Sequence, residues 1–164
     1  MLGYMLDTNI FGKLKLKGLD QKALYGARLY VTHNQWDEIQ HTSDEDKRNQ
    51  LMEVFQQVGA YEEQTISFFL GISVLNKAKL SSGCQFNAML NRLIELDKED
   101  GKTPPVDNQR RDILIAETAI KLNHTLTTND GNLRKVVGEF GGHSIKFRTL
   151  SSRLAKNGRS FSRE

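Results

Sequence analysis

The sequence predicts an α/β protein with a three-layer α/β/α sandwich around a central, mainly parallel sheet. Short apolar runs suited to buried strands alternate along the chain with segments whose apolar residues recur at helical spacing. In chains of this kind, helices cover both faces of a parallel sheet. The chain has 164 residues, of which 38% are hydrophobic and 26% charged. This length and composition fit one ordinary core and exclude wholesale disorder.

The predicted strands are short apolar segments that end in polar turns. The first covers 2–6 and is followed by Asp7, Thr8 and Asn9. Further strands are predicted at 29–31, 125–128 and 145–147. Because ligands of open α/β sheets bind outside the carboxyl ends of the strands, the residues that follow these strands are the first candidates for function.

Helices are predicted where apolar residues recur every three or four positions between the strands. Such stripes lie at 10–14, 36–40, 51–58, 86–96, 113–120 and 133–137. Ser43 with Asp46 imitates a capping box ahead of the third stripe. Asp107 or Asn108 is expected to cap the helix of the fifth stripe.

The net charge of +3 comes from the C-terminal end of the chain. Residues 151–164 hold four basic side chains and one acidic side chain, so that residues 1–150 are formally neutral. The composition therefore predicts a folded domain at 1–150 and a flexible basic tail at 151–164. Such a tail could scan a phosphate backbone, or it could simply keep the protein soluble.

Several classes of protein are excluded. With Cys84 as the single cysteine, the chain cannot form an internal disulfide framework or a cysteine-based zinc cage. No run of about 18 apolar residues indicates a membrane span. Asp7 also interrupts the apolar stretch that a signal peptide would need. We therefore expect a cytoplasmic protein that does not contact membranes.

Four carboxylates are predicted to lie near one edge of the sheet. Asp7 ends the first strand and Asp130 follows the strand at 125–128, while Glu38 and Asp112 occupy early turns of helices. Oxygen ligands without cysteine or paired histidine suit Mg²⁺ or Mn²⁺. A divalent ion can lower the pKa of a bound water and neutralise charge on a phosphate. If the four groups converge, they would suit metal-assisted phosphodiester hydrolysis.

Four motifs follow one another between about residues 2 and 147. They are a strand that ends in Asp7-Thr8-Asn9, a strand at 29–31 followed by a polar turn and a helix with Glu38, Asp112 at the start of an Ile- and Ala-rich stretch, and a strand that ends in Thr128-Asn129-Asp130. Each motif alone is weak, and their ordered combination is the specific signal. In this order and approximate spacing the chain resembles the PIN-domain nucleases, especially the small single-domain toxins of the VapC type.

This resemblance implies a PIN-like fold and a divalent-metal-dependent endoribonuclease that uses Mg²⁺ or Mn²⁺. The residues implied to bind the metal and to carry catalysis are Asp7, Glu38, Asp112 and Asp130. The residues expected to orient these groups or the phosphate are Thr8, Asn9 and Thr128, and those expected to contact nucleic acid are Lys13 and Lys17. An RNA substrate, an antitoxin that occludes the site, and a homodimer are the partners that the resemblance implies.

Other interpretations of the same residues stay open. Asp7 and Asp130 could serve only as helix N-caps. Asp37 is the alternative to Glu38, from which it lies about 100° away on a helix. Lys13 could belong to a solvated helix face. The site could also act on DNA or flap structures, or the domain could be a PIN-like module that binds nucleic acid without cutting it.

The middle of the chain departs most from the family pattern. Glu38 and Asp112 are 74 positions apart, more than we expect for the smallest family members. Within this stretch, 101–105 holds both prolines and must be a loop, whereas 66–75 is apolar without a clear period. The role of residues 43–106 is not predicted.

Overall fold

The structure, a computed structural model, describes residues 3–17, 27–73, 76–78 and 84–160. Within it, five strands form one parallel sheet in the order β3-β2-β1-β4-β5. The strands are β1 (Gly3–Leu6), β2 (Arg28–Val31), β3 (Tyr61–Glu62), β4 (Thr125–Thr127) and β5 (His143–Ile145). The four predicted strands are therefore present, each with its ends shifted by at most two residues. β3 was not predicted, because its two residues are exposed and form no apolar run.

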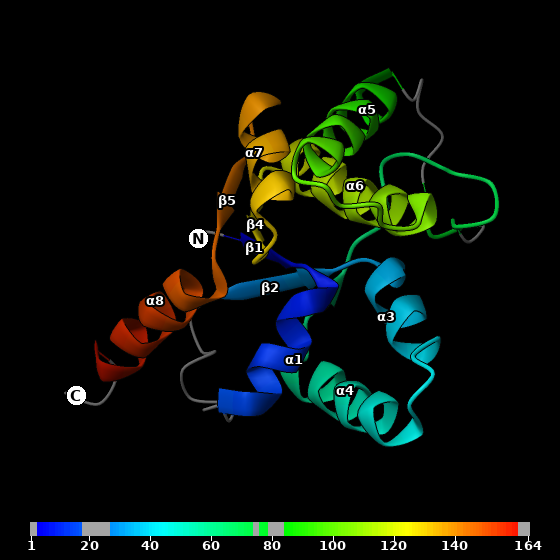
Figure 1. The fold of residues 1–164 in the computed structure, drawn as a ribbon. Helices are drawn as coiled ribbons and strands as arrows, with labels where there is room; N and C mark the ends of the chain where they lie inside the picture. Colours follow the sequence, from blue (N-terminus) through cyan, green and yellow to red (C-terminus); the bar gives the residue numbers. More distant parts are fainter. Residues whose placement is uncertain (1–2, 18–26, 74–75, 79–83, 161–164) are drawn as a thin grey trace.

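Helices cover both faces of this sheet, with α5, α6 and α7 on one side and α1 and α4 on the other (Figure 1). The helices are α1 (Thr8–Lys17), α3 (His33–Gln40), α4 (Glu45–Val58), α5 (Cys84–Glu99), α6 (Val106–Lys121), α7 (Gly131–Glu139) and α8 (Phe147–Ser160). No helix in the described ranges is long and apolar enough to span a membrane.

The central strand β1 shows how the two sides of the core are built. Tyr4 and Leu6 belong to a buried cluster with residues of α1, α4 and α8. Met5 belongs to a second cluster, formed with residues of α5, α6 and α7. This alternation follows from the strand itself, since successive side chains point to opposite faces. The predicted three-layer α/β/α architecture with a parallel sheet is confirmed.

The position of β1 in the sheet creates a place for a ligand. β2 and β3 lie on one side of β1, while β4 and β5 lie on the other. Leu6 pairs with Thr127, and the backbone N–H of Asp7 donates to the Thr127 carbonyl at 3.0 Å. The carboxyl ends of β1 and β4 therefore meet at a topological switch point, where α/β sheets form a crevice for ligands.

Two predicted helix caps are wrong. The N-cap of α4 is Asp44, whose side chain accepts a backbone N–H at 2.9 Å. Ser43 and Asp46 therefore do not form the capping box; Asp is as good an N-cap as Ser, so composition alone could not separate the two. α6 starts at Val106 without a side-chain cap, so that Asp107 and Asn108 lie inside it.

The C-terminal end also differs from the prediction. α8 runs across the predicted boundary at residue 150, and Leu150 and Leu154 are 1% and 6% exposed. Both pack in the cluster that contains Tyr4 and Leu6. Phe147, Leu150 and Leu154 recur at helical spacing. The free energy gained by burying these three side chains favours a packed helix, although the Ser- and Arg-rich composition around them favours a solvated chain. The prediction of a flexible tail from 151 is therefore wrong for this helix, and 161–164 lie outside the described residues.

Residues 43–106 contribute to all three layers. α4 packs on one face of the sheet and α5 on the other, while β3 extends the sheet beyond β2. The segment 66–73, which had no clear period, forms turns and bends. It is held to α6 by the Ile66 N–H, which donates to Thr118 Oγ1 at 3.3 Å. The described parts of the stretch between Glu38 and Asp112 thus belong to the folded domain.

Candidate active site

Asp7 lies at the carboxyl end of β1 and is 3% exposed. Its carboxylate accepts hydrogen bonds from Thr128 Oγ1, at 2.5 Å, and from Asn9 Nδ2. The pKa of Asp7 is raised to about 6. Burial is the main cause, and the Glu38 and Asp130 carboxylates also raise the pKa, whereas the hydrogen bond from Thr128 lowers it. The site therefore holds a buried acid whose charged form is partly compensated by two fixed donors.

Thr128 connects this acid to the turn after β4. Its hydroxyl oxygen accepts the Asp130 N–H at 3.0 Å and lies 3.2 Å from Asn9 Nδ2, which donates to it. The Asn129 N–H in turn donates to Asn9 Oδ1 at 3.4 Å. The turns after β1 and β4 are thus joined by side chains that the motifs contain, which places Asp7 and Asp130 at one edge.

Asp130 has the capping role that was one of its two interpretations. Its Oδ1 accepts the N–H groups of Asn132 and Leu133, at 2.7 and 3.0 Å, and so caps α7. No hydrogen bond to its Oδ2 is present among the described residues. Capping therefore uses one oxygen of this carboxylate and leaves the other for a ligand.

Glu38 is positioned by the start of α3. Thr32 is the N-cap in a capping box with Gln35, and Gln35 Nε2 donates to the Leu6 carbonyl at 2.6 Å. The start of α3 is thereby fixed to the end of β1. Glu38 lies about one turn after Gln35 on α3, and its Oε2 accepts a hydrogen bond from Thr8 Oγ1 at 2.7 Å. Gln35 was not singled out from the sequence, although Thr32 three residues ahead of it is the signal of a capping box.

The structure separates Glu38 from its neighbour Asp37. The Glu38 carboxylate raises the pKa of both Asp7 and Asp112. The Asp37 carboxylate instead raises the pKa of His33, against the lowering caused by burial. The helix geometry accounts for this difference, since adjacent residues are about 100° apart around the axis. Of these two acids, Glu38 is the one that lies with the others.

Asp112 lies in the second turn of α6 and has no hydrogen bond or ion pair within the described ranges. Burial raises its pKa well above the ordinary value, and so do Asp7, Glu38, Asp130 and Asp97, in decreasing order. Repulsion between carboxylates falls off with distance. These mutual effects therefore show that the four predicted acids share one region of the molecule.

Asp97 is a further buried acid, on α5, that the sequence analysis did not select. It is 5% exposed and accepts hydrogen bonds from Gln109 Nε2, at 2.7 Å, and from Asn132 Nδ2, at 2.9 Å. A signal was available, because Asp97 follows Leu93 by one turn on the buried face of α5. Its two donors satisfy it within the chain.

The chemistry of the four acids fits a hard divalent cation. They offer oxygen donors only, and no Lys, Arg or His among the described residues forms an ion pair with any of them. Their side chains are not closed around an ion: in the described part of the chain, no three His, Cys, Asp or Glu groups are arranged to hold one. The donor set is suitable, and its metal-binding role remains a prediction.

The two lysines predicted to contact nucleic acid are on α1. Lys13 is exposed and lies one turn after Asn9, which borders the acids. Lys17 ends the helix, and its side chain lies outside the described residues. Lys13 is thus available to a ligand that reaches the site along α1.

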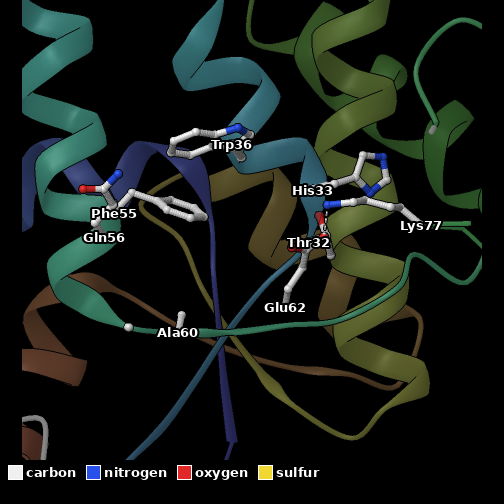
Figure 2. Close-up of a pocket in the computed structure, with 9 residues that line it drawn as sticks. Thr32, His33, Trp36, Phe55, Gln56, Ala60, Glu62 and Lys77 are labelled. Carbon is white, nitrogen blue, oxygen red and sulfur yellow. Dashed lines mark hydrogen bonds and ion pairs between the residues drawn. The ribbon is translucent and has the colours of Figure 1, made fainter.

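A pocket of about 360 Å³ is lined by residues of α3, of α4 and of the segments that follow α4 (Figure 2). Trp36 and Phe55 line it, with ring centroids 5.3 Å apart, and the ion pair between Glu62 and Lys77 is at its edge. Trp36 and Glu38 are about 200° apart around the helix. The pocket is therefore not part of the carboxylate site.

The comparisons with known proteins bear on the fold. No protein-family model matches the chain, and no curated protein matches it in sequence. Among solved structures, PAE2754 from Pyrobaculum aerophilum is similar to 94% of this chain and 96% of its own, with 18% identity and a TM-score of 0.51. The chain has a PIN-like α/β/α fold.

Two further similar structures are less well superposed. VapBC-1 from nontypeable Haemophilus influenzae matches 90% of this chain and 99% of its own, with 17% identity and a TM-score of 0.49. VapBC-5 from Mycobacterium tuberculosis, a member of the VapBC family of toxin-antitoxin systems, matches 89% and 98%, with 17% identity and a TM-score of 0.43. The predicted fold is confirmed by the parallel sheet and by the similarity to PAE2754, and the function has to be argued from the site.

Proposed function

We propose that the chain is a divalent-metal-dependent endoribonuclease. The observation that carries the proposal is a group of four carboxylates at a topological switch point, with Asp7 buried and the other three half-buried. No Lys, Arg or His in the described part of the chain forms an ion pair with any of them. Strongly perturbed acids in such a position are typical of functional sites. The donor set suits Mg²⁺ or Mn²⁺, which prefer carboxylate oxygens and share their remaining positions with water and phosphate.

Asp7, Glu38, Asp112 and Asp130 would hold the metal. When bound, a divalent ion supplies a water of lowered pKa and neutralises charge that develops on the scissile phosphate.

The other motif residues would hold these ligands in place. Thr128 and Asn9 donate to Asp7, and the Thr8 hydroxyl donates to Glu38. Donors of this kind fix the orientation of a metal-binding carboxylate. Asp130 is fixed because its Oδ1 caps α7, and its Oδ2 would then bind the metal.

RNA is the substrate that the resemblance to VapC-type nucleases favours. An unpaired strand can pass its backbone along the metal while its bases turn aside, and Lys13 on α1 would contact its phosphates. The same resemblance extends the proposal to a cytoplasmic toxin whose antitoxin covers the site. A homodimer is part of the proposal as well.

The test is a substrate panel of matched single-stranded RNA, single-stranded DNA and duplexes, with Mn²⁺ and with excess EDTA. We expect cleavage of RNA that requires Mn²⁺ and is restored when Mn²⁺ is added back. Equal cleavage of DNA would favour a DNA or flap nuclease. Binding of metal and nucleic acid without any cleavage would favour an inactive binding module, and undiminished cleavage in EDTA would exclude the metal mechanism.

Glu38→Gln and Asp37→Asn form a matched pair for this panel, because they neutralise adjacent carboxylates on one helix. We expect Glu38→Gln to abolish cleavage and Asp37→Asn to retain it. Expression in a bacterial host should arrest growth with the wild type and with Asp37→Asn, but not with Glu38→Gln. Arrest by all three would show that toxicity does not come from catalysis.

A further inference from the structure

α3 buries an amide side chain that has no hydrogen-bond partner. Asn34 is 1% exposed, and neither its Nδ2 nor its Oδ1 is paired within the described ranges. Burial of an unpaired amide opposes folding, because its hydrogen bonds to water are lost and not replaced. Such groups are rare in native cores and point to a functional role.

The place of Asn34 on α3 indicates what that role is. Asn34 precedes Glu38 by four residues, so the two are neighbours on one face of the helix. Side chains of a helix lean toward its N-terminus, which brings the Glu38 side chain over the turn that carries Asn34. The adjacent Gln35 contacts the Leu6 carbonyl, next to Asp7. The unpaired amide therefore lies beside the acidic site and not in a remote part of the core.

We propose that Asn34 is a positioning residue of the carboxylate site: when a divalent cation binds, Asn34 Nδ2 donates a hydrogen bond to the Glu38 carboxylate. This inference rests on the metal site proposed above. A carboxylate that ligates a metal through one oxygen keeps lone pairs on the other, and a donor to these fixes its orientation. Thr8 is the side-chain donor to Glu38 among the described residues, whereas Asp7 has both Thr128 and Asn9. Asn34 supplies Glu38 with a second donor.

The variant Asn34→Leu separates this role from a purely structural one. Leu has a similar volume and no polar atoms, so it removes the cost of the unpaired amide and should raise the midpoint of thermal unfolding of the metal-free protein. The same change should weaken Mn²⁺ binding about 10-fold, measured by titration calorimetry. Stability and metal affinity would then move in opposite directions, which a simple packing defect does not produce.

Thr127→Val is the matched control, because Thr127 is fully buried and its Oγ1 is also unpaired within the described residues. We expect this variant to leave the Mn²⁺ dissociation constant within about twofold of that of the wild type. In a Glu38→Gln background, adding Asn34→Leu should likewise change Mn²⁺ affinity by less than about twofold, since the partner of the amide has been altered.

Equal Mn²⁺ affinity of the wild type and Asn34→Leu would overturn the role of Asn34 and leave the metal site standing. A full 10-fold loss that persists in the Glu38→Gln background would also overturn it, because Asn34 would then act elsewhere. Absence of Mn²⁺ binding by the wild type would overturn both proposals. If Asn34→Leu does not fold, Asn34→Ala removes the amide without adding volume and is measured in the same way.

Discussion

Acidic side chains occupy two different environments in this protein, and their pKa values move in opposite directions. On the surface between α5 and α7, Arg92 donates two hydrogen bonds to Glu139, at 2.8 and 3.2 Å, and these lower the pKa of Glu139. At the carboxyl edge of the sheet, burial and neighbouring carboxylates raise the pKa of Asp7 and of Asp112. The first environment contains a cation paired with its acid, whereas no ion pair within the described residues involves Asp7 or Asp112.

The contrast shows why the two sets of acids differ in what they contribute. An exposed pair such as Arg92 and Glu139 is screened by water and contributes little to stability. The acids at the edge of the sheet repel one another, and a proton or an external cation relieves this repulsion. Charge at the edge of the sheet therefore reduces the stability of the metal-free protein, and under the proposed function it would provide affinity for a cation.

The largest expected difference is in activity. Asp7→Asn should reduce Mn²⁺-dependent RNA cleavage by at least about 100-fold, because it removes a charge that is proposed to bind the metal. Loss of such a charge has a larger effect than loss of a donor that orients it. Glu139→Gln should leave the cleavage rate unchanged. Cleavage rates and thermal unfolding are measured for both variants. A loss of stability in Asp7→Asn that matches its loss of activity would favour a purely structural role for Asp7.

The next difference is in the pH dependence of stability. The pKa of Asp7 is about 6 in the folded protein against an ordinary 3.8, so the folded state binds more protons between these values. The contribution of Asp7 is therefore fully present below about pH 4 and is lost as the pH rises through about 6, a change on the order of 1–3 kcal/mol.

This pH effect is read from the difference in unfolding free energy between the wild type and Asp7→Asn, measured without metal by urea unfolding from pH 4 to 8. The wild type should lose stability relative to the variant as the pH rises. Saturating Mg²⁺ should stabilise the wild type more at pH 7.5 than at pH 5, since ionised carboxylates bind it. A pH-independent difference would contradict the raised pKa of Asp7 in the folded protein.

A smaller effect is expected when a donor to Asp7 is removed. Thr128→Val deletes the hydroxyl that donates to the Asp7 carboxylate at 2.5 Å, which should raise the pKa of Asp7 further. The acid limb of the pH profile of cleavage should shift to higher pH, and the variant should lose about 1–2 kcal/mol of stability at pH 7.5. Thr127→Val on the same strand is the control. An unshifted profile would show that this hydrogen bond does not tune Asp7.

The smallest effect is expected at the surface cluster. Arg92→Gln removes the cation that pairs with Glu95 and Glu139, and we expect only a slight fall in the midpoint of thermal unfolding. The fall should shrink as salt is added, because mobile ions screen exposed pairs. RNA cleavage should be unaffected. A fall comparable to that caused by Thr128→Val would show that exposure has not weakened this cluster.

Local sequence patterns predicted much of the site, but they could not select between adjacent candidates. The motifs indicated that Asp7 and Asp130 follow two strands at one edge of the sheet, and the polar turns after β1 and β4 do meet there. They did not show that Glu38 rather than Asp37 faces the other acids, except through the family resemblance. They also missed Asp97, since an acid on an apolar helix face has meaning only once its donors are known.

By itself, the sequence determined the order of four of the five described strands and six of the seven described helices. It also determined the identity of the acids and the polar turns that present them, because these depend on periodicity and on residues close together in the chain. Tertiary structure decided which elements meet. β1 pairs with β4, about 120 residues later, and this pairing joins Asp7 to Thr128. It also decided that α8 packs on the core and that Asn34 is buried without a partner. These features depend on long-range contacts, whose formation no local pattern of residues records.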